Sequence, residues 1–315
     1  MTSPSDTMSD TLLDPPANPA RALSTTRPFF WSVRRELWEN RSIFIAPLVA
    51  AGVVIVGFTL SAIGMPHRRL ATLALPPEQQ TSLVAQPYES AAIAIMLIMA
   101  LVGMFYSLGA LHNERRDRSI LFWKSLPVSD RTTVLSKIAV PLLVIPPITF
   151  VTVLVTQLVI LIESSLILMT NGVPALAPGA PNPVVQTIVF LYGLVTLTLW
   201  QAPVYGWLLV VSGWARRSPF LWAVLPPLAI CVIEKLAFNT AHFAHLLGSR
   251  IGGGSSEGFT RLPHGTAKDA PIPVFGLDQL DPGRFFTSPG LWLGLAFTAA
   301  CVAAAVWLRR RREPS

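Results

Sequence analysis

The chain has 315 residues, of which 52% are hydrophobic and only 13% are charged, and its formal net charge is +7. Charged residues make up about a quarter of an ordinary soluble domain. The composition therefore excludes that class and predicts an all-α integral membrane protein.

Charge-free intervals long enough to cross a bilayer recur along the chain, since one crossing needs about 20 apolar residues. The interval 164–215 is too long for one crossing, and the turn-rich stretch NGVPALAPGAPNP divides it. We therefore predict a transmembrane domain over 42–308 with six spans, at about 43–65, 90–111, 138–163, 184–211, 218–238 and 287–308.

The distribution of Lys and Arg orients these spans, because positive residues near span ends stay on the cytoplasmic side. Six spans place both ends of the chain and the loops 112–137 and 212–217 on one side, together with 17 of the 24 Lys and Arg residues. Both termini are thus expected in the cytoplasm. The topology explains the positive charge without nucleic-acid binding.

Residues 1–27 are polar and rich in Pro, Ser and Thr, which predicts a disordered cytoplasmic tail. Residues 28–41 follow as an amphipathic helix that we expect on the membrane surface, with a helical extension of the first span as the alternative. Its aromatic, apolar and basic residues are the candidates for contact with the interface: Phe30, Trp31, Arg34, Arg35, Leu37 and Trp38.

Mixed charge is concentrated between the second and third spans, in NERRDRSILFWKSLPVSDRTTVLSK. We predict a short amphipathic helix over 114–126, because Glu114 and Asp117 would lie in its first turn, where negative charge favours the helix dipole. Pro127 would end it, and Ser129 or Asp130 would cap the helix that enters the third span.

The same segment contains an apolar run that positive-inside topology does not explain. Its residues must rest on lipid headgroups, on the ends of the spans or in a groove of another protein. They are Ile120, Leu121, Phe122, Trp123 and Leu126.

Prolines interrupt the later spans, and we expect Pro141, Pro146 and Pro147 to kink or locally break the third one. Cys231 and Cys301 both fall within spans, where they are expected to pack as small apolar residues. The chain ends in a basic cytoplasmic tail, 309–315.

Three charged residues fall near the outer ends of the predicted spans: Glu163, Glu234 and Lys235. Ionisable groups inside a membrane usually face the bundle interior or a water-filled cavity. These residues are candidates for a translocation path, and a position at the outer headgroup level is the alternative.

At the charged loop the chain resembles the membrane subunits of ABC-2 type transporters, especially bacterial permeases that carry a loop like ERRDRSILFWKSLPVSD between the second and third spans. The resemblance implies a coupling helix in this loop, a surface helix before the first span, and a working unit of two permeases and two ATP-binding subunits. It further implies a location in the bacterial inner membrane. The residues it assigns to coupling are Glu114, Arg115, Arg116, Asp117, Arg118, Phe122, Trp123 and Lys124.

These expectations make the chain the non-catalytic permease of an ATP-driven transporter, more plausibly an exporter than an importer. No phosphate-binding GxxxxGK[ST] motif, HExxH or CxxC occurs, so ATP and Mg²⁺ would be bound by the partner and no cofactor by this chain. Three alternatives stay open: a membrane enzyme with a metal on Glu234, His242 and His245, an ATP-independent carrier, and a ligand-sensing subunit.

Overall fold

The computed structural model of the protein describes residues 26–73, 75–116, 129–172, 182–252, 258, 277 and 280–311. Within these ranges the chain forms helices and no strand, which confirms the all-α prediction. The predicted tail over 1–27 lies outside the described residues except for its last two positions.

Six of the helices are long and apolar enough to cross a membrane, as predicted. The third is composite, since α7 continues through a π-helical turn, η1, into α8. Their bounds are α2 (Ser42–Ala62), α4 (Pro77–Gly109), α7 (Asp130–Ala139) with η1 (Val140–Val144) and α8 (Ile145–Thr170), α9 (Pro183–Trp214), α10 (Pro219–Phe238) and α14 (Pro289–Arg311).

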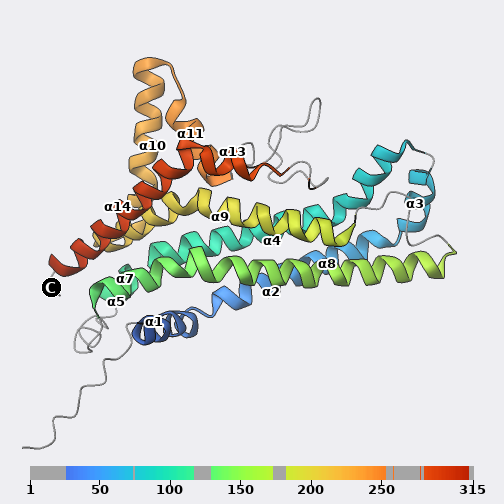
Figure 1. Ribbon diagram of the computed structural model, residues 1–315, viewed down its shortest axis with the longest axis horizontal. Coiled ribbons are helices and arrows are strands. Elements are labelled where there is room, and N and C mark those ends of the chain that lie inside the picture. The colour runs from blue at the N-terminus through green and yellow to red at the C-terminus, as the bar shows by residue number, and fades with distance from the viewer. Residues whose placement is uncertain are drawn as a thin grey trace, which may run out of the picture.

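All of these except α10 lie side by side along the long axis of the molecule (Figure 1). Helices α9 and α14 approach each other closely, since a Cβ atom on Gly206 would lie 3.3 Å from the Cα atom of Thr298. The main apolar core includes Ile43 of α2, Ile95 of α4 and Leu209 of α9. Small residues thus bring the helices together, and branched side chains fill the space between them.

The π-helical turn η1 contains Pro141, one of the prolines expected to break the third span. Proline lacks the amide hydrogen that regular α-helical bonding requires, and its ring crowds the preceding turn. The wider turn accommodates it, and the helix resumes at Ile145 with Pro146 and Pro147 in its first turn, where no amide is needed.

Helix α4 begins at Pro77, well before the predicted start of the second span at residue 90. Pro87 lies within it without ending it. Glu89, which the sequence had suggested for an outer loop, is therefore an internal residue of a helix. At 1.5 Å per residue, the 33 residues of α4 extend over about 50 Å.

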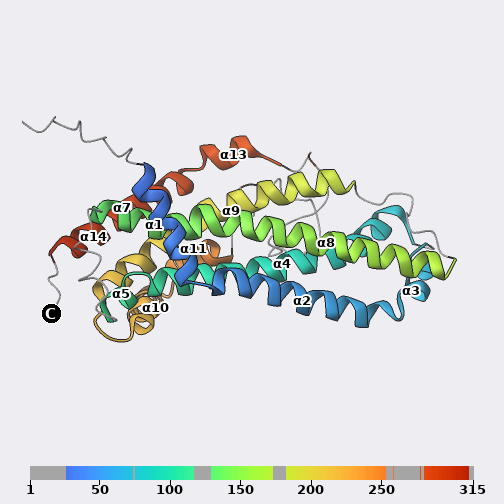
Figure 2. The same ribbon diagram turned by 90° about the horizontal axis from the view of Figure 1, so that it is seen from below.

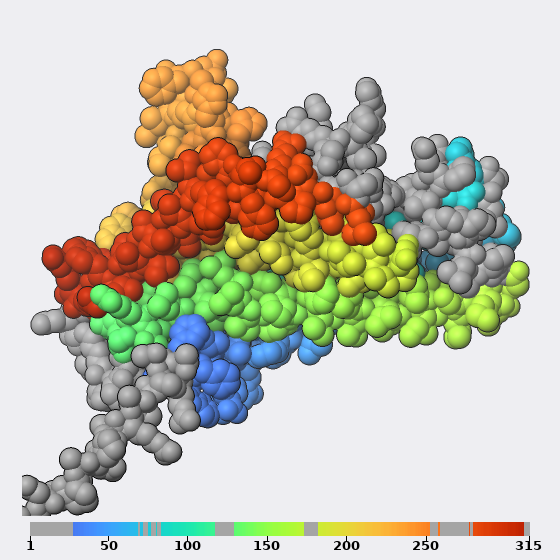
Figure 3. Space-filling model, viewed as in Figure 1, coloured from blue at the N-terminus to red at the C-terminus, as the bar shows by residue number. Residues whose placement is uncertain are grey.

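Among the described residues, five shorter helices lie at the ends and on one side of the bundle: α1 (Thr26–Glu39), α3 (Met65–Leu73), α5 (His112–Arg116), α11 (His242–Gly252) and α13 (Pro282–Thr287). Figure 2 shows α1, α5 and α7 at the same end as the C-terminus, and α3 at the other. The space-filling view shows α10 and α11 standing out from the bundle, across its long axis (Figure 3). Ala223 is the buried residue of α10.

Helix α11 is attached to the bundle by Arg250. The Arg250 guanidinium lies 4.1 Å from the ring centroid of Trp200 and donates to the carbonyl oxygens of Trp200 and Gly290. Gly294, one turn after Gly290 on α14, leaves room for it, since a Cβ atom there would lie 2.7 Å from Nη1 of Arg250. Two main-chain carbonyls of α11 also accept hydrogen bonds from the side chains of Trp200 and Gln201.

Candidate coupling site

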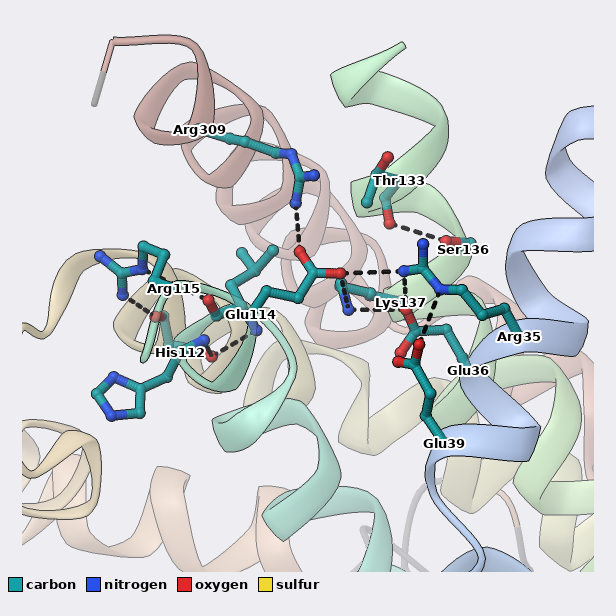
Figure 4. Close-up of polar contacts among 12 residues, drawn as sticks. Arg35, Glu36, Glu39, His112, Glu114, Arg115, Thr133, Ser136, Lys137 and Arg309 are labelled. Carbon is teal, nitrogen blue, oxygen red and sulfur yellow. Dashed lines mark hydrogen bonds and ion pairs between the residues drawn. The ribbon is translucent and has the colours of Figure 1, made fainter. Parts of the chain in front are cut away.

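Six charged side chains from four helices meet at the end of the bundle where α1, α5, α7 and the C-terminal part of α14 come together. Figure 4 labels all of them except Asp130. Three are acids and three are bases, so the group is neutral as a whole. We call it the ion cluster: Arg35, Glu36, Glu114, Asp130, Lys137 and Arg309.

Glu114 joins three helices within the ion cluster. One of its carboxylate oxygens lies 3.0 Å from Nη2 of Arg35 and 3.0 Å from Nζ of Lys137. The other lies 2.7 Å from Nη1 of Arg309. A single carboxylate therefore contacts α1, α7 and α14 at once.

Glu36 and Lys137 form the most deeply buried pair, each with 2% of its side chain exposed. Nζ of Lys137 lies 2.8 Å from Oε1 of Glu36, and the other carboxylate oxygen accepts a 2.9 Å hydrogen bond from the Tyr106 hydroxyl. At the edge of the ion cluster, Nε of Arg309 donates to Asp130 over 2.9 Å. Glu39, outside it, is half-exposed; burial raises the pKa of its carboxyl, and neighbouring Arg35 opposes that rise.

Removing charges from water costs several kcal/mol per ion, and mutual attraction compensates only when the groups are closely paired. Glu114 meets this condition with three cationic partners and Lys137 with two carboxylates. Separating any one helix would take at least one partner from a buried charge. The ion cluster therefore favours movement of α1, α5, α7 and α14 as one body.

The opposite side of α5 is fixed to the end of α9. The Ser212 hydroxyl accepts hydrogen bonds from the amides of Leu111 and His112, at 2.9 and 3.0 Å. Nη2 of Arg115 donates to the carbonyl oxygens of Ser212 and Ala215, which satisfies acceptors at the C-terminal end of α9. Helix α5 is thus held between the ion cluster and α9.

The helix that follows the charged loop begins as predicted. Ser129 is the N-cap of α7, and its hydroxyl accepts a 3.1 Å hydrogen bond from the Thr132 amide. Asp130, the other candidate cap, instead pairs with Arg309.

The residues predicted to couple to an ATPase fall into two groups. Glu114 and Arg115 face the bundle through the contacts described above, and Arg116 is exposed. The remaining five lie outside the described residues: Asp117, Arg118, Phe122, Trp123 and Lys124.

The residues predicted for the surface helix also divide. Arg35 points into the ion cluster and Leu37 packs against the main core. The exposed members are aromatic or basic, and the Arg34 guanidinium lies 5.1 Å from the ring centroid of Trp31 and 4.7 Å from that of Trp38. Phe30 is also exposed. The inward face of this surface helix, α1, is therefore more highly charged than the sequence pattern suggested.

The three charged residues proposed for a translocation path do not come together. Glu234 accepts hydrogen bonds from the amides of His242 and Phe243, at 2.7 and 2.8 Å, so its carboxylate caps α11. Lys235 is exposed on α10, and Glu163 is partly exposed on α8. The described part of the chain contains no group of three possible metal ligands, and the contact between Glu234 and His242 is to the main chain.

Sequence reasoning missed most of the ion cluster as a unit. Lys137 and Arg309 were assigned to a loop and a tail because both lie at predicted span ends. The available signal was the helical continuity of α7 into the third span, which carries Lys137 into the bundle. Long-range pairing with Glu36, which comes 101 residues earlier, has no local signature.

Scans against family models, curated proteins and solved structures found no match to this chain.

Proposed function

We propose that the chain is the permease subunit of an ATP-driven transporter of the ABC-2 type, acting as an exporter. It would pair with a second permease copy or homologue in the bacterial inner membrane, with both termini in the cytoplasm. A separate ATP-binding subunit would supply ATP and Mg²⁺ and perform the hydrolysis, and this chain would be neither an enzyme nor a cofactor-binding protein.

The observation that carries this proposal is the set of ion pairs around Glu114. The segment 117–128 connects α5, which ends at Arg116, to α7, which begins at Asp130. Both of these helix ends are tied into the ion cluster, and α5 is tied to α9 as well. A force applied to the segment would therefore reach four helices and the surface helix together.

In this mechanism the two parts of the coupling motif have different roles. The apolar residues around Trp123 would dock on the ATP-binding subunit, and Glu114 would transmit the displacement. Glu114 is a positioning residue, since its contacts are within the bundle.

The experiment is affinity purification of the tagged chain from its native membrane, followed by identification of the proteins recovered and measurement of ATPase activity. We expect an ATP-binding subunit with the wild type. Trp123→Ala should reduce its recovery, whereas Glu114→Gln should retain recovery but weaken the effect of the permease on ATP hydrolysis.

Trp292→Ala is the matched control, because Trp292 is an exposed tryptophan in the first turn of α14, far along the chain from the coupling segment. Its recovery of the partner should equal that of the wild type. Purification of the wild-type chain without any ATP-binding protein, in several mild detergents, would contradict the proposal.

A further inference from the structure

A small cavity lined by apolar and polar side chains lies between α4, α8 and α9, on the side of the bundle's middle that is away from the ion cluster. Its volume is about 30 Å³, and it is partly open to the surface. Its polar and aromatic lining consists of Tyr88, Glu89, Gln157, Gln186 and Phe190. None of these residues belongs to the coupling site.

The polar groups of this cavity are incompletely paired. No base among the described residues forms an ion pair with Glu89. The side-chain nitrogen of Gln186 is buried and meets no acceptor in the described part of the chain. Gln157 donates from Nε2 to the Tyr88 carbonyl oxygen at 3.4 Å, a bond that leaves its own side-chain oxygen available.

The level of the cavity along the bundle follows from helix geometry. Glu89 precedes Gly109, the last residue of α4, by 20 positions, and Gln157 follows Lys137 by the same number. Both separations correspond to about 30 Å, the thickness of a bilayer's hydrocarbon core. With the ion cluster at one boundary of the hydrocarbon, the cavity lies at the other.

We propose that this cavity binds the protonated amino group of a lipophilic amine whose alkyl chain stays in the bilayer. The inference deepens the proposed function by naming a substrate class, and it rests on that function only in taking the bound amine as cargo.

The chemistry of the lining favours a cation over the alternatives. A carboxylate without a basic partner attracts positive charge, and the side-chain oxygens of Gln157 and Gln186 are acceptors for an ammonium group. Glu89 disfavours phosphate and carboxylate headgroups. The space accommodates a group about the size of one water molecule, which suits a primary ammonium and excludes a sugar or a phosphate.

The test uses the purified chain in phosphatidylcholine nanodiscs and radiolabelled octylamine as the probe, with empty nanodiscs to subtract partitioning. We expect saturable binding to the wild type. Glu89→Gln keeps the side-chain shape and should weaken binding about tenfold or more, the usual effect of losing a hydrogen bond to a charged group. Glu89→Asp keeps the charge and should bind more tightly than Glu89→Gln.

Glu39→Gln is the matched control, because it removes a half-exposed carboxylate of α1, at the other end of the bundle, from a position that does not line the cavity. It should bind octylamine as the wild type does, and unlabelled 1-octanol should not compete. Equal binding by wild type and Glu89→Gln, or competition by 1-octanol as strong as that by unlabelled octylamine, would overturn the proposal.

This assay contains no ATP-binding subunit, so it is independent of the test for coupling. Amine binding by a chain that purifies alone would support the cavity and reject the transporter. Recovery of the ATP-binding subunit without Glu89-dependent amine binding would support the transporter and reject the cavity as an amine site.

Discussion

At the scale of single residues, the ion pairs at this end of the bundle are of two kinds. Glu36 and Lys137 are almost completely buried, whereas the contact between Arg35 and Glu39 is at the surface, with 49% of the Glu39 side chain exposed. Exposed ion pairs contribute roughly 0–1 kcal/mol, but breaking a buried pair costs roughly 3–5 kcal/mol because one charge stays buried alone. The burial of each pair therefore predicts which substitutions lower the free energy of unfolding.

We expect Lys137→Met to lower the free energy of unfolding by about 3 kcal/mol, since Glu36 and Glu114 both lose a cation. Adding Glu36→Gln should restore part of the loss, because the amide removes a buried charge that Lys137 no longer neutralises and that keeps only Arg35 as a cationic partner, while still accepting from Tyr106. A double-mutant cycle of denaturant unfolding in detergent measures the coupling.

Glu39→Gln provides the comparison, with an expected change below about 0.5 kcal/mol. Additive effects of Lys137→Met and Glu36→Gln would show that the buried pair is not energetically coupled.

At the scale of secondary-structure elements, α11 depends on two glycines of α14. Arg250 lies on Trp200 only because Gly290 and Gly294 present no side chains there. Burial lowers the pKa of the Arg250 guanidinium. The ordinary pKa of arginine is so high that the group stays charged. The packing of α11 thus depends on backbone access as much as on charge.

Gly294→Ala should destabilise the protein by about 1–2 kcal/mol, because the new methyl group would meet both Arg250 and Pro203, the latter at 3.0 Å. Thermal unfolding in detergent measures the effect, and hydrogen exchange at the amides of α11 locates it. Gly52→Ala should have the opposite sign, since nothing lies within 4 Å of its Cβ position and alanine favours the helix by roughly 0.5–1 kcal/mol. Equal effects of the two substitutions would contradict this packing.

The elements also show what the sequence could and could not predict. Hydrophobic intervals located the six long helices because bilayer-spanning length and composition are local properties. Helix α4 extends 13 residues beyond the predicted start of the second span, because a helix tolerates Glu89 and a proline such as Pro87 that resemble a loop in the sequence. The contacts of Glu234 with α11 and of Glu114 with α14 depend on tertiary structure. Their charge within an apolar chain therefore marked these two residues as candidates, but the sequence could not predict the groups that they contact.

At the scale of the whole molecule, α1 and the end of α14 lie at the same end of the bundle (Figure 2). This arrangement suits the proposed orientation, in which both termini face the cytoplasm. Helix α10 differs from the other long helices by extending across the bundle axis (Figure 1), although its length and apolar composition suit a crossing.

Single cysteines in a variant lacking Cys231 and Cys301 test the orientation. In intact cells, a membrane-impermeant maleimide should label Thr170→Cys, at the C-terminal end of α8, and Asn239→Cys, directly after α10. It should label Arg310→Cys only after permeabilisation. Protection of Asn239→Cys in intact cells would show that α10 does not cross, and labelling of Arg310→Cys there would reverse the proposed topology.

The length of the bundle has a consequence for the surrounding bilayer. After Lys137 the continuous helix runs over residues 138–170, 33 mostly apolar residues or about 50 Å at helical rise, which exceeds the hydrocarbon core of about 30 Å. Exposed apolar side chains persist near its far end, at Leu166 and Met169. This is a positive hydrophobic mismatch, which a bilayer relieves by thickening or a helix by tilting. Because any change in tilt alters that mismatch, membrane thickness itself becomes a variable acting on the conformation of the protein.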